Sequence, residues 1–484
     1  MTFLSSTKTN RHMEDGLSSA TEMPRRWEIV LAEEVKRSCY IALPMVVVMV
    51  SQYLLRAASI SMVGHLGQLE LAGTAVAISF TNVTGFSLLF GMASALETLC
   101  GQAYGAQQYH MLGAYTYGAM ISLILVCLPI SILWIYIDKL LILIGQDPLI
   151  SAEARKFSVW LIPTLFPYAI LQLITRYLLS QSLIFPMLWS SVAVLLIHVP
   201  ICWALVFKLG FRTPGAALAI GISYTLNVVI LGVYLYRSKA CKRTRATCLG
   251  DVFSSIKEFL RFAVPSAVMI CLEWWSYEIV VLLSGLLPNA RLETSVLSIC
   301  LTVDILHYYI PYSFGVAAST RVSNELGAGN PEAAKMALLA VSVLGAMEVI
   351  IASTILFCSR SILGYAFGKD KELVNYVKEM TPLLCLSIFA DTIQTILSGV
   401  ARGSGWQDIG AYINLGSYYL VGIPMAIVLG FVCHLNGKGL WSGLIIGIVI
   451  QCILLTLVTC STNWKKQARK ARERMFKEEL IDEQ

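Results

Sequence analysis

Charged residues are scarce in this sequence, since only 14% of its 484 residues are Asp, Glu, Lys or Arg. A soluble domain carries roughly 25%. The deficit is uneven, because the stretches 338–357 and 440–460 hold almost no charge. Runs of about 18 or more apolar residues can cross a bilayer as helices, and runs this continuous are unlike the alternating strands of a membrane barrel. The sequence therefore excludes an ordinary soluble domain and predicts an all-α membrane protein.

The sequence also lacks the patterns expected of a metal centre or a catalytic site. Its thirteen cysteines contain no CxxC pair, and most lie inside apolar stretches, as small packing residues do. The six histidines are scattered and unpaired. We therefore expect no metal ion, no cofactor and no enzymatic activity. The net charge of +6 gathers in the tails and one linker, which argues against nucleic-acid binding.

Twelve apolar segments are each long enough for one membrane crossing. Lys and Arg concentrate in the two tails and the middle linker, and an even number of spans places all three on one side. Because positively charged loops favour the cytoplasm, we expect both termini to be cytoplasmic. The expected organisation is an N-terminal tail (1–37), an N-lobe of six helices (38–237), a linker (238–257), a C-lobe of six helices (258–461) and a C-terminal tail (462–484).

An internal repeat relates the two halves of the chain. ALPMVVVM, which contains Pro44, matches AVPSAVMI, which contains Pro265. VPICWAL matches IPMAIVL, with Pro200 over Pro424, and the offsets stay between 221 and 224 residues. Each copy holds an even number of spans, so both enter the membrane from the same side. We therefore predict two lobes related by a pseudo-two-fold axis along the membrane normal, as in transporters with parallel repeats.

Two acidic residues lie deep inside predicted spans of the C-lobe. Glu273 in the seventh span and Asp391 in the tenth are both near mid-bilayer, where a charged side chain costs roughly 2.5–3.5 kcal/mol. Neighbouring carboxylates in water-poor surroundings tend to hold a proton, which contact with water or a cation releases. The pair is our candidate site for coupling to protons, although two residues that only hydrogen-bond helices together would give the same pattern.

Other polar residues are candidate accessory members of this site. Asp304 and His307 are one turn apart in the eighth span, and they form either a second protonation site or only a hydrogen-bonded couple. Glu278 points about 140° away from the first acid, toward a cavity or toward the external surface. Gln394 continues the face of the second acid.

Several residues near the acids are candidates for lining a substrate cavity that can bind cations through aromatic faces, although ordinary packing is the alternative. These residues are Trp274, Trp275, Tyr277, Tyr309 and Asn414.

Two prolines lie near the start of the first and seventh spans, at Pro44 and Pro265. Proline removes a backbone hydrogen bond and kinks a helix. Each proline is therefore either a hinge or a static kink.

Several long motifs resemble the plant branch of the multidrug and toxic compound extrusion (MATE) family. They are CLEWWSYE around Glu273, AASTRVSNELGAGNPEAAK and LSGVARGSGWQDIGAYINLGSYYLVGIP. The resemblance covers residues 25 to about 475. It implies two six-helix lobes in a V, rocker-like alternating access, and export of organic compounds in exchange for H⁺ or Na⁺, with plant members generally driven by protons. The family's cation-linked acids in the seventh and tenth helices fall on Glu273 and Asp391.

Two positions depart from the family pattern. Some prokaryotic relatives carry an Asp in the first helix, where this sequence offers only Gln52 and Arg56, so the resemblance places coupling in the C-lobe. Asp304 stands where relatives usually have an uncharged polar residue. Arg56 and Arg176 are the expected partners of buried acids, unless they extend toward the membrane interface. Glu97, at a cytoplasmic helix end, is expected to cap a helix or to form an ion pair between the lobes.

The function expected from these features is a secondary active antiporter that exports organic solutes from the cytosol in exchange for protons, with Na⁺ as the alternative coupling ion. We expect a monomer in the plasma or vacuolar membrane, with a small organic substrate and the lipid bilayer as its partners. A channel would need a filter-like run or a charged ring, and the sequence shows neither. A related lipid-linked flippase would be expected to have a cationic cavity, which the acids of the seventh span do not support.

Overall fold

The structure, a computed structural model, describes residues 6–245 and 248–476. Almost all of these residues are helical, and none of them lies in a strand. Twelve helical segments within the described ranges are long and apolar enough to cross a membrane. The prediction of an all-α membrane fold with twelve spans is confirmed.

The first half of the chain forms one bundle, the N-lobe. Its elements are α1 (Ser6–Gly64), α2 (Gln68–Thr81), the π turn η1 (Asn82–Phe86), α3 (Ser87–Ala93), α4 (Ala95–Gly105), α5 (Tyr109–Ile135), α6 (Ile137–Leu143), α7 (Pro148–Ser180), α8 (Phe185–Trp203), the π turn η2 (Ala204–Lys208) and α9 (Arg212–Arg237). Asp147 caps α7 by accepting a hydrogen bond from the Leu149 amide at 2.8 Å. Pro148 follows it at the first helical position, which lacks an intrahelical partner in any case.

The second half forms the C-lobe. Its elements are α10 (Leu249–Ser284), α11 (Ala290–Gly327), α12 (Pro331–Cys358), α13 (Arg360–Leu363), the 3₁₀ turn η3 (Gly364–Ala366), α14 (Lys371–Ser404), α15 (Gln407–Asn414), the π turn η4 (Leu415–Gly422), α16 (Ile423–Ile427), the π turn η5 (Val428–Val432) and α17 (Asn436–Ser461). A separate helix, α18 (Trp464–Met475), follows.

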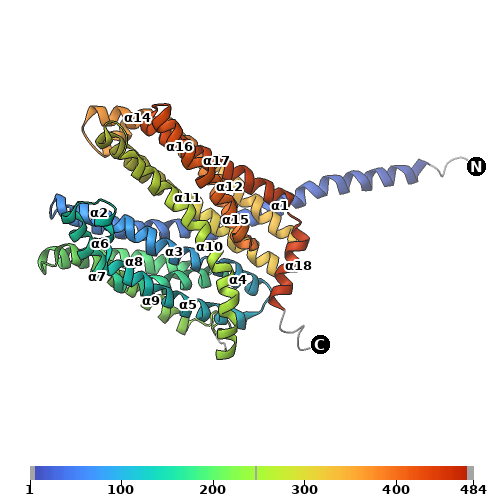
Figure 1. Cartoon of the computed structure of the whole chain (residues 1–484). Helices are drawn as coiled ribbons and strands as arrows, with labels where there is room; N and C mark the ends of the chain where they lie inside the picture. The colour runs from blue at the N-terminus through green and yellow to red at the C-terminus, as the bar shows by residue number, and fades with distance from the viewer. Residues whose placement is uncertain (1–5, 246–247, 477–484) are drawn as a thin grey trace, which may run out of the picture.

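The two lobes lie side by side, diverge at one end and meet at the other (Figure 1). We call the end where they meet the inner end; α4, α15 and α18 lie there, and the opposite end is the outer end. The first helix of each lobe also packs on the other lobe, since α1 contacts α11 and α12 while α10 contacts α3 and α5. These two helices therefore join the lobes along the membrane, and α4 packs on α11 and α14 of the C-lobe at the inner end.

Short π turns recur at matched positions of the repeat. η2 follows Pro200 at the same distance as η5 follows Pro424. A π turn is rare and arises where the regular helical ladder is interrupted, and proline removes one donor from that ladder. The recurrence of such an uncommon element at equivalent positions supports the internal repeat inferred from sequence.

Three helices extend into segments that the sequence assigned to the tails and the linker. α1 begins at Ser6, within 1–37. α10 begins at Leu249, within 238–257, and its Ser255 hydroxyl donates to the Ala114 carbonyl at 3.0 Å, so its first turns are packed on α5. α18 lies within 462–484 and packs against α4, α11 and α12. An apolar face at helical spacing needs a surface to cover it, and the buried residues of this face are Trp464, Ala468, Ala471 and Met475.

Candidate substrate cavity and inner seal

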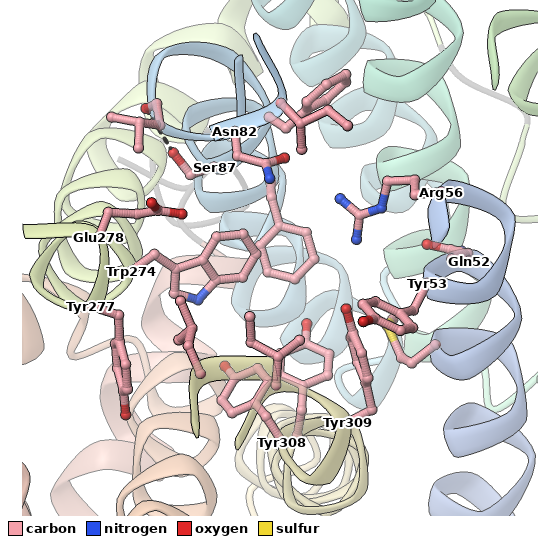
Figure 2. A pocket seen from close by; sticks show the side chains of 18 of the residues that line it. Gln52, Tyr53, Arg56, Asn82, Ser87, Trp274, Tyr277, Glu278, Tyr308 and Tyr309 are labelled. Carbon is pink, nitrogen blue, oxygen red and sulfur yellow. Dashed lines mark hydrogen bonds between the residues drawn. The ribbon is translucent and has the colours of Figure 1, made fainter. Parts of the chain in front are cut away.

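A cavity of about 260 Å³ lies between the two lobes. Its lining comes from α1, α2, η1, α3, α7 and α9 on one side and from α10, α11 and α14 on the other. Figure 2 shows the aromatic rings of Trp274, Tyr308 and Tyr309 around this space. A concave, largely apolar site with a few polar groups is the usual form of a site for a small organic molecule.

Most of the predicted cavity residues line this space, and one does not. Trp274, Trp275, Tyr277 and Tyr309 are all in contact with the cavity. Asn414 is fully buried behind its wall, where its amide donates to the Met269 carbonyl at 2.7 Å. A buried amide that bonds backbone and an amide that faces a cavity have the same sequence pattern, so the sequence alone could not separate them.

Three acidic residues of the C-lobe reach the cavity from three different helices. Glu273 on α10, Asp304 on α11 and Asp391 on α14 line the cavity and are 6%, 4% and 2% exposed. Asp391 is close enough to interact electrostatically with both of the others. The structure therefore brings together the two acids of the predicted coupling site and places Asp304 beside them.

Neutral polar groups surround the two predicted coupling acids. The Tyr277 hydroxyl lies near Asp391. Three amide side chains lie near Glu273, those of Gln394, Asn414 and Gln451. Hydrogen-bond donors stabilise a carboxylate that has lost its proton, whereas burial favours the protonated form. The surroundings can therefore hold these acids in either protonation state.

Gln451 was not among the residues that the sequence singled out. It is the only amide side chain in the nearly charge-free stretch 440–460, and that isolation is the signal that could have identified it. In the structure its amide donates to Asn414 at 2.7 Å, and its carbonyl oxygen accepts from Tyr418 at 2.7 Å. Gln451 thus links α17 to the residues behind Glu273.

Glu278 lines the cavity, which settles the alternatives of a cavity or an external position. Its carboxylate accepts a hydrogen bond from the Ser79 hydroxyl of the N-lobe at 2.7 Å. The neighbouring Trp275 donates from its indole nitrogen to the Val83 carbonyl at 3.1 Å. Both contacts cross from α10 to the N-lobe, so this part of α10 connects the two walls of the cavity.

His307 does not line the cavity and forms no hydrogen bond with Asp304, although the two are close enough to interact electrostatically. Its Nε2 atom is 2.9 Å from a carboxylate oxygen of Glu348 on α12. Neither His307 nor Glu348 lines the cavity, whereas Asp304 accepts a hydrogen bond from Ser387 at 3.2 Å. One turn of α11 therefore carries two separate polar contacts.

The N-lobe wall carries a cation. Arg56 on α1 lines the cavity, and Figure 2 shows its guanidinium group pointing into the space. The side chains of Tyr309, Tyr168 and Tyr224 lie near the guanidinium group. In contrast to the expectation that it would pair with a buried acid, Arg56 forms no ion pair with any carboxylate of the described residues.

At the inner end, a buried ion pair joins the two lobes. Arg402 of α14 lies with its Nε atom 2.9 Å from a carboxylate oxygen of Glu97 on α4. The other oxygen of Glu97 is 3.9 Å from Arg176 of the N-lobe. All three side chains are at most 5% exposed. The prediction of an inter-lobe ion pair at Glu97 is confirmed, and Arg176 is a partner of a buried acid as expected.

Further contacts around this ion pair close the inner end, and we call them together the inner seal. Gln102 of α4 donates to the Gly403 carbonyl at 3.2 Å, and Gln407 donates to the Thr98 hydroxyl at 2.5 Å. Asn324 of α11 donates to the Ser180 carbonyl at 3.1 Å. Each of these bonds runs between a residue of the N-lobe and a residue of the C-lobe.

Two glycines allow the backbones of α4 and α11 to approach at the seal. A Cβ atom on Gly105 would lie 1.9 Å from the Asn324 carbonyl oxygen, and one on Gly327 would lie 2.1 Å from the Gln102 carbonyl oxygen. Both distances are far inside van der Waals contact. No other residue type fits at these positions unless the helices move apart.

α18 packs across the seal. Arg474 donates to the Gln102 side chain at 2.8 Å, and the ring of Trp464 lies 6.1 Å from that of Trp406. One contact is to the N-lobe and the other is to the C-lobe. The helix therefore bridges both lobes at the inner end.

The two predicted hinge prolines lie inside continuous helices, Pro44 in α1 and Pro265 in α10. Neither helix is interrupted at its proline. The alternatives of a hinge and a static kink both fit this arrangement, and the hinge stays a prediction.

Comparisons with known sequences agree with the two-lobed fold. The MatE family profile matches residues 44–204 and 265–428, one segment in each lobe. Protein DETOXIFICATION 14 of Arabidopsis thaliana is 55% identical over 451 residues, which cover 93% of both chains. Protein DETOXIFICATION 3 of the same plant is 53% identical over 446 residues, which cover 92% of this chain and 94% of that protein.

Solved structures show the same architecture. The crystal structure of the eukaryotic MATE transporter AtDTX14 matches with a TM-score of 0.89 and 55% identity, covering 92% of this chain and all of that chain. An outward-facing MATE family multidrug resistance transporter matches with a TM-score of 0.80 over 91% of this chain and 97% of its own, at 16% identity. The second match concerns the fold alone. Because it matches the family profile and relatives that share more than half of its residues, the chain belongs to the multidrug and toxic compound extrusion (MATE) family of efflux transporters.

Proposed function

We propose that this chain exports organic solutes from the cytosol in exchange for protons, by alternating access of its two lobes. The observation that carries the proposal is the group of three carboxylates, Glu273, Asp304 and Asp391, in the wall of a cavity that is sealed at its inner end. A proton carried by this group reaches water through the cavity only on the side to which the cavity opens.

Proton binding and substrate binding compete in this scheme. A carboxylate in water-poor surroundings favours the protonated form, and water or a cation stabilises the ionised form. A substrate that enters the cavity therefore favours release of the proton, and a proton arriving from the far side favours release of the substrate. Glu273 and Asp391 carry the exchanged proton, and Asp304 lies close enough to Asp391 to change the affinity of that carboxylate for the proton.

The driving force of such an exchange is sufficient for substantial accumulation. Each unit of pH difference is worth about 1.4 kcal/mol per proton. Two units therefore support roughly hundredfold accumulation when one proton is exchanged for one neutral solute.

The orientation and location form part of the proposal. The Lys and Arg residues of the tails and the linker favour a cytoplasmic inner end. Both the plasma membrane and the vacuolar membrane offer an acidic compartment on the other side. The protein works as a monomer in the bilayer, because the cavity is formed within one chain.

Reconstitution in liposomes tests the proposal. We expect an imposed pH gradient to drive uptake of a fluorescent organic dye into acidic-inside vesicles, and an ionophore that collapses the gradient to abolish it. A sodium gradient at constant pH is the control for the alternative coupling ion. Transport that is driven by sodium alone, or dye equilibration that is indifferent to any gradient, contradicts proton antiport.

A further inference from the structure

Arg56 is the starting point, because its charge is not neutralised by the protein. Burying a charged side chain at membrane depth is costly, so such residues usually pair or take part in function. Arg176 and Arg402 both lie against Glu97. Arg56 has no carboxylate partner among the described residues, and its neighbours are the tyrosines Tyr168, Tyr224 and Tyr309. A tyrosine hydroxyl is neutral at physiological pH, so the positive charge of Arg56 persists in the cavity.

The opposite wall of the same cavity carries the opposite charge. Figure 2 shows Glu278 on the side of the cavity that faces Arg56, with the ring of Trp274 between them. Both charged groups line the cavity, but they do not form an ion pair with each other. The three carboxylates Glu273, Asp304 and Asp391 lie on the same C-lobe wall as Glu278. The cavity is thus a dipolar space with an aromatic lining.

The chemistry of a guanidinium group defines what would fit at Arg56. Its planar fork binds a carboxylate through two parallel hydrogen bonds, and such charge-assisted bonds are roughly twice as strong as neutral ones. The Tyr309 hydroxyl near it can donate a further bond to the same anion. The carboxylates of the other wall attract a cation, and the aromatic rings between the walls suit a flat apolar body.

We propose that Arg56 is the anion-binding end of the substrate site, and that the cavity selects amphoteric aromatic molecules. In the bound state the anionic group of the molecule lies on Arg56 of the N-lobe, and its cationic group lies toward Glu278 of the C-lobe. This inference rests on the proposed export function, because it assumes that the cavity receives the exported solute. It adds a class of substrate and assigns a specificity residue to the N-lobe.

A matched pair of dyes tests the charge preference. Rhodamine 110 carries a free carboxylate and a delocalised cation, whereas rhodamine 123 is its methyl ester and is only cationic. Binding of each dye to the purified full-length protein is measured by fluorescence polarisation at neutral pH, without any gradient. We expect rhodamine 110 to bind about tenfold more tightly, since a charge-assisted bidentate contact is lost in the ester.

Variants of Arg56 distinguish a specific loss of anion binding from a general loss of folded protein. Arg56→Gln should remove the preference, because the affinity for rhodamine 110 falls about tenfold while the affinity for rhodamine 123 changes by less than about twofold. Arg56→Lys should retain part of the preference. Arg237→Gln, at the exposed end of α9, is the matched control and should change neither affinity. Size-exclusion profiles and Tm values establish that each variant is folded.

The outcomes are distinguishable from those of the export test. Equal affinities of the two dyes for the unmodified protein, an equal loss for both dyes in Arg56→Gln, or no binding of either dye overturns the inference. Selective binding of rhodamine 110 without gradient-driven transport would instead support the site and contradict proton antiport. Because binding needs no gradient, the two proposals fail separately.

Discussion

The first helices of the two lobes present the same backbone framework to the cavity with different charges. Gln52 on α1 and Glu273 on α10 stand at the same distance after the matched prolines of the repeat, and both line the cavity. The C-lobe places a carboxylate at this position. The N-lobe places a neutral amide there, and one turn later it places the cation of Arg56. The repeat therefore determines where a side chain lies, and the residue type determines what the wall can bind.

Because of this difference, one wall of the cavity can bind protons and the other can bind the anionic group of a solute. Among the described residues, every acidic side chain that lines the cavity comes from the C-lobe. An exchangeable proton can therefore be held on one wall, while the other wall is free to recognise the solute. Two walls with equal sets of acids would bind more protons but would offer an anionic solute no counter-charge.

The largest effect is expected from neutralising the acidic wall. Glu273→Gln and Asp391→Asn keep the size of the side chain but fix it in a form that cannot exchange a proton. Dye accumulation driven by two pH units should fall from roughly hundredfold toward equality. Glu348→Gln, outside the cavity, is the control and should keep most of the accumulation. Gradient-driven uptake at the unmodified level in both neutral variants would contradict the assignment of coupling to this wall.

A large effect is also expected at the inner seal, where the two lobes are held together by opposite charges. Arg402→Gln leaves Glu97 with only the more distant Arg176, and breaking a buried ion pair typically costs about 3–5 kcal/mol. Hydrogen exchange at the inner ends of α4 and α14 should become faster, because the seal opens more often. Arg402→Lys should restore part of the protection. Unchanged exchange in Arg402→Gln would show that the ion pair does not hold the lobes together.

A smaller effect, on stability, is expected where glycines allow α4 of the N-lobe to pack closely against α11 of the C-lobe. Gly105→Ala places a Cβ atom against the Asn324 carbonyl, and overpacking of this kind costs about 1–3 kcal/mol. Gly232→Ala on α9 meets no atom within 4 Å and is the matched control. Tm should fall in the first variant and stay level or rise slightly in the second, since alanine favours a helix. Equal Tm changes in the two variants would mean that the close approach at Gly105 contributes nothing to stability.

The smallest effect is expected from giving the N-lobe a carboxylate of its own. Gln52→Glu places an acid one turn before Arg56, where pairs of opposite charge attract by about 0.2–0.5 kcal/mol on an exposed helix. Rhodamine 110 should bind up to about twofold more weakly, because the new acid competes for Arg56. Proton coupling should stay unchanged, since the N-lobe wall has no second acid nearby. An additional transported proton in this variant would show that position in the repeat, and not the surrounding wall, determines coupling.

The sequence predicted the fold well because its signals are long and redundant. Twelve apolar segments and a repeat with a near-constant offset point to the same arrangement, and each of these signals uses many residues. The orientation inferred from the Lys/Arg distribution stays a prediction. The depth of Glu273 and Asp391 within their spans singled them out, and both line the cavity, while their role in coupling stays a prediction. Depth along a helix follows directly from counting residues.

The sequence was less informative about side-chain contacts, because these depend on how each helix is rotated and on which distant helix lies beside it. His307 was paired with Asp304 because the two are one turn apart, but its hydrogen bond goes to Glu348 of α12. Arg56 was expected to find an acid, and only the packing of α1 against its neighbours shows that it faces open space. A pattern along one helix does not specify which other helix faces it, so such contacts required the three-dimensional structure.

Glu97 has one arginine in each lobe, and this division has a consequence for the capture of solutes. If the lobes separate at the inner end as proposed, Glu97 and Arg176 leave together, and the N-lobe rim stays neutral. Arg402 stays on the C-lobe and becomes hydrated, so the entrance at the inner end acquires a positive charge when it opens. Such an entrance repels a simple cation and tolerates a molecule whose charges cancel. The ion pair that closes the inner end would thereby also select solutes by charge before they reach the cavity.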